Sequence, residues 1–120
     1  MTDSLLSQYP GSKIIIVDPL NSCYGQGSMA IEASKLRASG KSIEEVASWL
    51  EENKLRFNQF ATVETLTYLK NAGRVKASSA FFGNLFGVKP IIISDAKGQN
   101  VAMKKVKGKQ NSMQELVRSE

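Results

Sequence analysis

The segment Thr62–Pro90, TVETLTYLKNAGRVKASSAFFGNLFGVKP, decides the fold. Its pattern predicts the end of a strand, a short helix, a Gly73-Arg74 corner, a second helix rich in Phe and Gly, and the start of another strand. Arg74 is an isolated cation between two apolar helices. This arrangement suggests an apolar pocket with a charged mouth, although a cation that complements a helix C-terminus would give the same pattern.

The rest of the chain supplies further strands. Aliphatic and aromatic runs predict them, and polar or glycine-containing loops separate them. The predicted strands are Lys13–Asp18, Phe57–Val63, Ile91–Ser94 and Gln99–Val106, with a hairpin turn at 95–98 between the last two. Pro90 is expected at the first position of its strand, where a missing N–H is tolerated.

Helical periodicity places helices around these strands. The expected helical segments are one or two turns at 4–9, then 28–39, 43–53, the segment around Leu66–Ala72 capped by Gly73, Ser78 or Ser79 to Gly87, and a last helix with Met113, Leu116 and Val117 on its apolar face. Ser42 with Glu45, and Ser112 with Glu115, form capping-box patterns. The order of strands and helices predicts the α/β class.

The composition limits the chemistry of this chain. Its 120 residues contain no histidine and one cysteine, Cys23. Histidine-based triads and an intramolecular disulfide are therefore excluded, and no zinc-ligand spacing is present. The lone thiol fits a reducing cytosol, and no apolar run reaches the length of a membrane span. We expect a cytoplasmic protein that is not an enzyme and binds no metal or cofactor.

Positive charge is concentrated in the second half of the chain. Residues 1–60 hold six Lys or Arg and seven Asp or Glu, whereas residues 61–120 hold ten and four. A basic half favours an anionic partner, such as a phosphate, a carboxylate, nucleic acid or an acidic protein face. The lysines at 104, 105, 107 and 109 could touch nucleic acid, but no helix-turn-helix, stacking-aromatic or zinc-finger pattern accompanies them. A solvated cationic strand edge is the preferred interpretation.

Two further motifs have a functional and a structural interpretation. Gly25–Ala30 matches G-x-G-x-x-A, which would hold a phosphate at a helix N-terminus, but the first Gly comes too late after the strand for a dinucleotide fingerprint. A glycine loop that permits close packing is preferred. Phe81–Phe86 could form the wall of an apolar pocket, although ordinary core is the more frequent role of such a segment.

Three stretches carry a family resemblance: IIIVDPLNSCYGQG (residues 14–27), TVETLTYLKNAGRVKASSAFFGNLFGVKPIIISDAKG (62–98) and MKKVKGKQNSMQELV (103–117). They resemble the DegV family of bacterial fatty-acid-binding proteins. The most specific part is the L-x-Y-L-x-x-x-G-R-V-x-x-x-S-A block, followed by Lys89-Pro90-Ile91. The resemblance implies a two-domain α/β protein that buries one long-chain fatty acid and presents it to a separate kinase. An acyltransferase of phospholipid synthesis would then receive the acyl phosphate.

The resemblance also implies which residues bind the lipid. They are Arg74, Phe81, Phe82, Leu85, Ile92, Lys107 and Lys109. Arg74 corresponds to the family's Gly-Arg arginine near the head group, and Phe81 to Leu85 would form the wall of the tail pocket. Lys107 and Lys109 stand where the family commonly has R-G-R, which keeps the charge but weakens bidentate recognition of an anion.

The chain resembles only the middle of a DegV protein. Residues 1–56 would be the end of the first DegV-like α/β domain, and residues 57–120 the start of the second. The family's upstream Thr-Ser and Ser-Gly-Thr motifs and its histidine-bearing C-terminal part have no counterpart here. We therefore expect an incomplete lipid site and self-association through exposed sheet edges. The alternative function is a small basic module that interacts with protein or nucleic acid without lipid.

Overall fold

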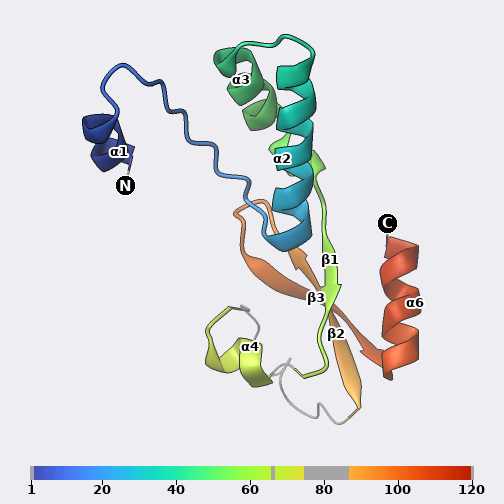
Figure 1. The fold of residues 1–120 in the computed structure, drawn as a ribbon. Coiled ribbons are helices and arrows are strands. Elements are labelled where there is room, and N and C mark those ends of the chain that lie inside the picture. Colours follow the sequence, from blue (N-terminus) through green and yellow to red (C-terminus); the bar gives the residue numbers. More distant parts are fainter. Residues whose placement is uncertain (1, 66, 75–86, 120) are drawn as a thin grey trace.

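The computed structural model describes residues 2–65, 67–74 and 87–119. In chain order its elements are α1 (Thr2–Gln8), α2 (Cys23–Ala38), α3 (Ile43–Asn53), the 3₁₀ helix η1 (Lys54–Arg56), β1 (Phe60–Thr62), α4 (Thr67–Asn71), β2 (Val88–Ser94), β3 (Asn100–Lys107) and α6 (Lys109–Ser119) (Figure 1). This mixture of helices and sheet confirms the predicted α/β class. The predicted helix from Ser78 or Ser79 to Gly87 lies mostly outside the described residues.

The three strands form one antiparallel sheet in the order β1-β2-β3. β1 pairs with β2 from Phe60↔Ile93 to Thr62↔Ile91, and β2 pairs with β3 along its whole length. The prediction for Pro90 is wrong, because β2 begins at Val88 and the proline is its third residue. The position tolerates proline since the pairing with β1 stops at Ile91, so Pro90 has a strand neighbour only in β3.

The hairpin between β2 and β3 confirms the turn predicted at 95–98. The Asp95 N–H donates to the Gln99 carbonyl at 2.9 Å, and the Gly98 N–H donates to the Asp95 carbonyl at 2.9 Å. The Asp95 carboxylate accepts the N–H groups of Lys97 and Gln99. Gly98 has a φ of +72°, a conformation that favours glycine.

Local signals also predicted α3 correctly. The Ser42 hydroxyl accepts the Glu45 N–H at 3.2 Å, and the Glu45 carboxylate accepts the Ser42 N–H at 2.8 Å, which completes the capping box. Gly73, with a φ of +62°, ends the short helix α4, and the Arg74 N–H reaches back to the Leu69 carbonyl at 3.0 Å.

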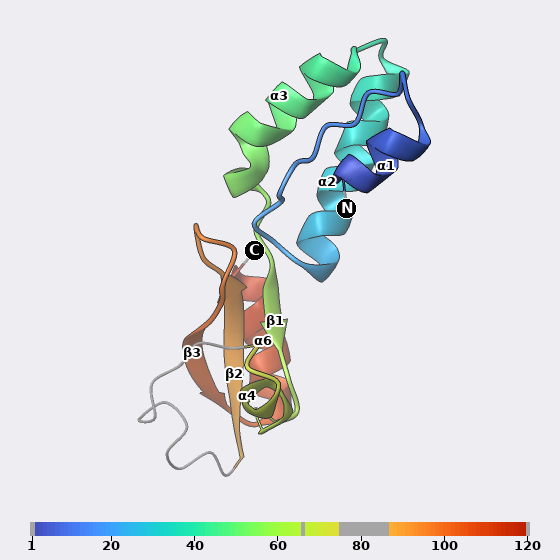
Figure 2. The ribbon, with the colours of Figure 1, turned by 90° about the vertical axis from the view of Figure 1, so that its left-hand side faces the viewer.

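α6 covers one side of the sheet, and α4 lies on the opposite side (Figures 1 and 2). The capping box predicted at Ser112 and Glu115 is wrong, because the helix already begins at Lys109. The predicted apolar face is also wrong, since Met113 and Val117 are 53% and 74% exposed. The less exposed positions are instead Ser112, Glu115, Leu116 and Ser119, which recur at helical spacing. This face is mostly small and polar, so hydrophobic periodicity could not identify it.

The strand predicted at Lys13–Asp18 is not formed. This segment runs as an extended chain from α1 to the start of α2 (Figure 1), and no strand among the described residues lies beside it. A strand needs neighbours for its backbone hydrogen bonds, and the described chain supplies none here. The next helix also begins earlier than predicted, at Cys23, so the expected glycine loop forms the first turns of α2.

The molecule is elongated and has two lobes. The helical lobe contains α2 packed against α3, and the sheet lobe contains the three strands and α6 (Figure 1). The extents are 56 × 30 × 19 Å and the Cα radius of gyration is 18.2 Å, whereas a compact chain of this length has about 14 Å. Met29 and Leu50 are buried in the helical lobe, and Ile91 and Ile92 in the sheet lobe. Across the described ranges, no helix is both long and apolar enough to span a membrane.

Candidate functional site

A polar cluster joins the two lobes. The Gln59 side-chain amide donates to the Ser22 hydroxyl at 2.9 Å and to the Ser94 hydroxyl at 3.2 Å. The Ser94 hydroxyl donates to the Asn21 side-chain oxygen (Oδ1) at 3.1 Å, and the Asn21 side-chain amide donates to the Phe57 backbone carbonyl at 2.5 Å. The cluster therefore connects the start of α2, the approach to β1 and the end of β2.

The backbone around Asn21 is held in an uncommon conformation. Leu20 and Cys23 have φ values of +49° and +44°, which are rare for residues other than glycine. The Leu20 N–H donates to the Asp18 carboxylate at 3.0 Å. The hairpin also lies close to this loop. A Cβ added at Gly98 would lie only 3.0 Å from the Leu20 Cα. These contacts show that the hairpin and the loop before α2 support each other.

The same cluster argues against a phosphate site at the glycine motif. The Gly25 N–H donates weakly to the Gln59 side-chain oxygen at 3.4 Å, and the Ser22 N–H donates to Asn21 at 3.0 Å. A Cβ at Gly25 would lie 2.2 Å from the Asn21 amide nitrogen, so Gly25 permits close packing. This supports the structural interpretation of the motif, because the Gly25 N–H is already used and both glycines of the motif lie inside α2.

A cleft opens beside the cluster, between the start of α2, β1 and the end of α6. It has a volume of about 670 Å³ and is lined by Cys23, Tyr24, Arg56, Asn58, Gln59, Phe60, Ala61, Leu116 and Ser119. Its size falls within the range of small-molecule sites. Arg56 is an exposed cation beside apolar side chains, and its guanidinium donates to the Asn53 side-chain oxygen at 3.0 Å.

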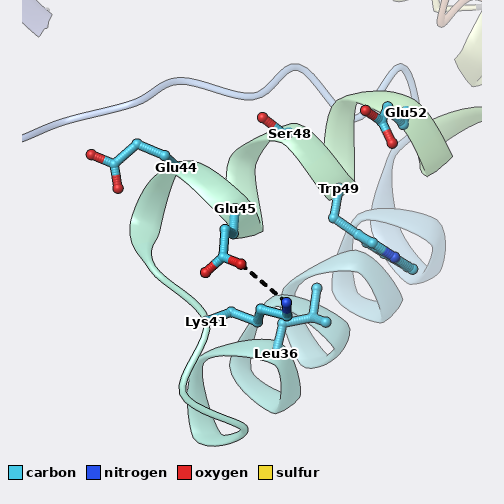
Figure 3. A pocket seen from close by; sticks show the side chains of 7 residues that line it. All are labelled: Leu36, Lys41, Glu44, Glu45, Ser48, Trp49 and Glu52. Atoms are coloured by element: carbon cyan, nitrogen blue, oxygen red, sulfur yellow. Dashed lines mark hydrogen bonds and ion pairs between the residues drawn. The ribbon is translucent and has the colours of Figure 1, made fainter.

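A second hollow lies between α2 and α3, and its charged groups are largely paired. It measures about 380 Å³ and is lined by Leu36, Lys41, Glu44, Glu45, Ser48, Trp49 and Glu52 (Figure 3). Glu45 points to Lys41, 3.0 Å away, and Glu44 forms an ion pair with Lys13. The Ser42 backbone N–H, followed by Lys41, holds the pKa of Glu45 below its ordinary value of 4.5. The charges of Lys41, Glu44 and Glu45 are therefore explained by structural ion pairs, without a ligand.

The structure places the lipid-binding residues predicted by resemblance in different surroundings. Arg74 is exposed at the end of α4, and its guanidinium donates to the Ala72 carbonyl at 3.4 Å. Ile92 is 5% exposed in the central strand. Lys107 and Lys109 are exposed on either side of Gly108. Three residues, Phe81, Phe82 and Leu85, lie outside the described residues. The 670 Å³ cleft includes none of the four that are described.

The end of the sheet near Gly108 is basic. Val88 pairs with Lys107, and the Gly108 N–H donates to the Gly87 carbonyl at 2.8 Å. The Lys89 ammonium, whose side chain is 12% exposed, donates to the Glu64 carboxylate at 2.8 Å. Lys89 first, and Lys109 to a smaller degree, lower the pKa of Glu64. We name Lys89, Lys107 and Lys109 the basic end.

The sequence patterns did not predict two features of these sites. The polar cluster of Asn21, Gln59 and Ser94 joins residues far apart in the chain, although each adjoins an aliphatic or aromatic run. Thr62, at the end of β1, has a buried hydroxyl without a hydrogen-bond partner among the described residues. Within those residues, no group of three or more Cys, Asp or Glu side chains has the geometry to hold a metal ion.

Comparison with known sequences identifies a family. A family model described as "Uncharacterised protein, DegV family" matches residues 2–120. A DegV domain-containing protein of Clostridium perfringens is 37% identical over 114 residues, which are 95% of this chain and 39% of the relative. The chain spans about two fifths of the length of the curated relatives it matches.

Solved structures show the same fold. A DegV family protein from Thermus thermophilus, described as fatty-acid binding, is 29% identical with a TM-score of 0.78, and the match covers 98% of this chain and 41% of that one. DegV from Bacillus subtilis, described as a fatty-acid-binding protein, is 28% identical with a TM-score of 0.74, and the match covers 98% and 42%.

Proposed function

The chain belongs to the DegV family, and from this premise we propose that it carries part of a fatty-acid-binding site. The observation that carries the proposal is the similarity to the fatty-acid-binding protein of Thermus thermophilus, at 29% identity and a TM-score of 0.78. The similarity to the Bacillus subtilis protein supports the same ligand class. Because the chain spans about two fifths of these relatives, it contributes part of the site.

The proposal divides the chain between two domains. Residues 1–56 belong to the end of a first α/β domain, and residues 57–120 to the start of a second. The separate burial of Leu50 in the helical lobe and Ile91 in the sheet lobe supports this division. The polar cluster around Asn21 and Gln59 then lies where the two domains meet.

In this proposal the basic second half binds the carboxylate head group, and apolar side chains bind the tail. Arg74, Lys107 and Lys109 offer charge-assisted hydrogen bonds to a carboxylate. Phe81, Phe82, Leu85 and Ile92 contact the hydrocarbon chain, which gains about 0.8 kcal/mol for each buried methylene. The exposure of Arg74, Lys107 and Lys109 supports a head group near the surface.

The proposal extends to the fate of the bound acid. A carboxylate near the surface is accessible to a second protein, so this chain would present it to a fatty-acid kinase. The acyl phosphate would then pass to an acyltransferase of phospholipid synthesis. The exposed cations Lys107 and Lys109 support this step, because they would also attract an acidic face of such a partner.

Binding of a fluorescent long-chain fatty acid to the 120-residue chain tests the proposal. We expect saturable binding, displaced by unlabelled fatty acid, and a several-fold weaker affinity for Arg74→Ala because a charge-assisted hydrogen bond is lost. Lys35→Ala is the matched control, since Lys35 is an exposed cation on α2, in the other lobe, and should leave affinity unchanged.

Two outcomes would contradict the proposal. If no fatty acid binds and organic extraction of the purified protein releases none, this chain has no lipid site. If Arg74→Ala binds as tightly as the unchanged chain, Arg74 does not hold the head group. Binding of oligonucleotides that falls steeply with salt would favour the basic interaction module instead.

A further inference from the structure

Lys89 ties the segment after β1 to the central strand. Its ammonium donates to the Glu64 backbone carbonyl at 2.6 Å and to the Glu64 carboxylate at 2.8 Å. The Lys89 side chain is 12% exposed, whereas that of Glu64 is 72% exposed. Exposed ion pairs contribute little by themselves, but this lysine is largely buried and is held at two points. Its bond to the backbone carbonyl fixes the path of the chain as well as a side chain.

The sheet places Lys89 where the pairing of β1 with β2 ends. The last partners are Thr62 and Ile91. The same antiparallel register, carried two residues further, sets Glu64 opposite Lys89. Pro90 lies between Lys89 and Ile91 and has no backbone N–H with which to continue the ladder. The Lys89 side chain supplies a donor to the Glu64 carbonyl instead, so the chain leaves the sheet from a fixed point.

The anchored segment leads from β1 into α4 (Figure 1). At the start of the helix, the Thr67 N–H donates to the Thr65 hydroxyl at 3.3 Å. α4 has five residues, and a helix this short is not stable without support at its ends. The anchor at Glu64 is therefore one of the supports that place α4.

Arg74 follows the position of α4. Its N–H closes the helix end by donating to the Leu69 carbonyl at 3.0 Å. Its guanidinium folds back on the same helix end and donates to the Ala72 carbonyl at 3.4 Å. A displacement of α4 would therefore move both the backbone and the charged group of Arg74.

We propose that Lys89 is a positioning residue, which sets the place of Arg74 by fixing the segment between β1 and α4. This inference rests on the proposed function, in which Arg74 holds the carboxylate of a fatty acid. Lys89 itself is engaged by Glu64 and does not bind the head group. The affinity for the acid then depends on Lys89 only while Arg74 is present.

Lys89→Met tests the proposal, because it keeps the apolar stem of the side chain and removes both hydrogen bonds to Glu64. With the fluorescent fatty acid, we expect a several-fold weaker affinity. In the Arg74→Ala background, Lys89→Met should cause no further loss. Losses of the same size in both backgrounds would mean that Lys89 acts without Arg74, and would overturn the proposal. An affinity that Lys89→Met leaves unchanged would overturn it as well.

Amide hydrogen exchange of the unliganded chain gives an independent measurement. The Arg74 amide, bonded to α4, should exchange several-fold faster in Lys89→Met. Glu64→Gln keeps the backbone carbonyl as an acceptor, so its effect should be smaller. Lys104→Met is the matched control. It breaks the 2.6 Å ion pair with Glu115, between β3 and α6, and should leave the Arg74 amide unchanged.

The two measurements separate this proposal from the proposed function. If the unchanged chain binds no fatty acid, the lipid site fails, and exchange of the Arg74 amide alone decides whether Lys89 positions α4. An Arg74 amide that stays as protected in Lys89→Met as in the unchanged chain overturns the proposal. If the hairpin amide of Gly98 also exchanges faster, Lys89→Met has loosened the whole sheet, and Glu64→Gln decides. That variant must then accelerate the Arg74 amide without the Gly98 amide, or the proposal is overturned.

Discussion

At the scale of single residues, Asn21 is the link between the lobes. Its amide side chain bonds the Phe57 carbonyl and the Ser94 hydroxyl, and it occupies the space beside Gly25. A side chain at residue 25 would therefore displace Asn21 from its hydrogen bonds. At Gly27, two residues further along the same helix, an added Cβ would meet no atom within 4 Å.

We predict opposite effects for two glycine substitutions. Gly25→Ala should destabilise the protein by about 1–3 kcal/mol, because its Cβ would overlap Asn21. Gly27→Ala should be neutral or stabilise by up to about 1 kcal/mol, since alanine favours the helix. Urea denaturation of both variants measures the difference. Equal midpoints for the two would show that Asn21 moves away without loss.

At the scale of elements, α3 and α6 differ in what determines them. α3 is closed at its start by the reciprocal hydrogen bonds of Ser42 and Glu45. The side of α6 toward the sheet carries Ser112, 1% exposed, whereas Val117 is 74% exposed. Close packing against the sheet, more than side-chain hydrophobicity, therefore sets the orientation of α6.

We predict a pH dependence from the α3 cap. Because the folded-state pKa of Glu45 is lowered from 4.5, its stabilising contribution is complete above the unfolded value and is lost as pH falls through the folded one. The unfolding midpoint should decrease on acidification below pH 4.5, and less so in Glu45→Gln. At neutral pH, Ser42→Ala should cost about 1 kcal/mol. An identical acid dependence in both proteins would contradict the cap's role.

Two substitutions in α6 separate packing from hydrophobicity. Ser112→Leu should destabilise by about 1–3 kcal/mol, because the site is full and the Ser112 hydroxyl, which donates to the Lys109 carbonyl, is lost. Val117→Ser should change stability by less than about 0.5 kcal/mol, since Val117 is exposed. Thermal unfolding compares them, and a larger loss for Val117→Ser would reverse this orientation of α6.

At the scale of the whole molecule, the elongated shape follows from two small cores joined by a polar contact. Burial is shared between Met29 and Leu50 at one end and Ile91 and Ile92 at the other. The connection between them includes the hydrogen bonds of Ser94 with Gln59 and Asn21, together with the close approach of Gly98 to Leu20. Hydrophobic burial therefore stabilises each lobe separately, and directional hydrogen bonds set the position of one lobe against the other.

We predict that the shape persists in dilute solution. Small-angle scattering, extrapolated to low concentration so that the monomer predominates, should give a radius of gyration near the Cα value of 18.2 Å. A collapsed single-core monomer would give about 14 Å. Gln59→Ala removes the bonds to Ser22 and Ser94, so it should broaden the distance distribution. A compact value for the unchanged chain would contradict two separate cores.

The sequence by itself determined the features that depend on neighbouring residues. The bounds of α3, the hairpin at 95–98 and the Gly73 cap were predicted because their hydrogen bonds close over a few residues. The residue pattern around Gly73-Arg74 also identified the family. The roles of Arg74 and Lys107 in lipid binding stay predictions, because the described contacts do not bring Arg74 to the basic end.

Only the tertiary structure decided the rest. The aliphatic run at Lys13–Asp18 has strong strand propensity, yet it forms no strand because pairing requires a neighbour that the described chain does not supply. The inward face of α6 and the cluster of Asn21 with Ser94, 73 residues apart, depend on which surfaces meet. Propensity and capping act along the chain, whereas strand pairing and packing act between segments, and that difference separates what the sequence determined from what the fold decided.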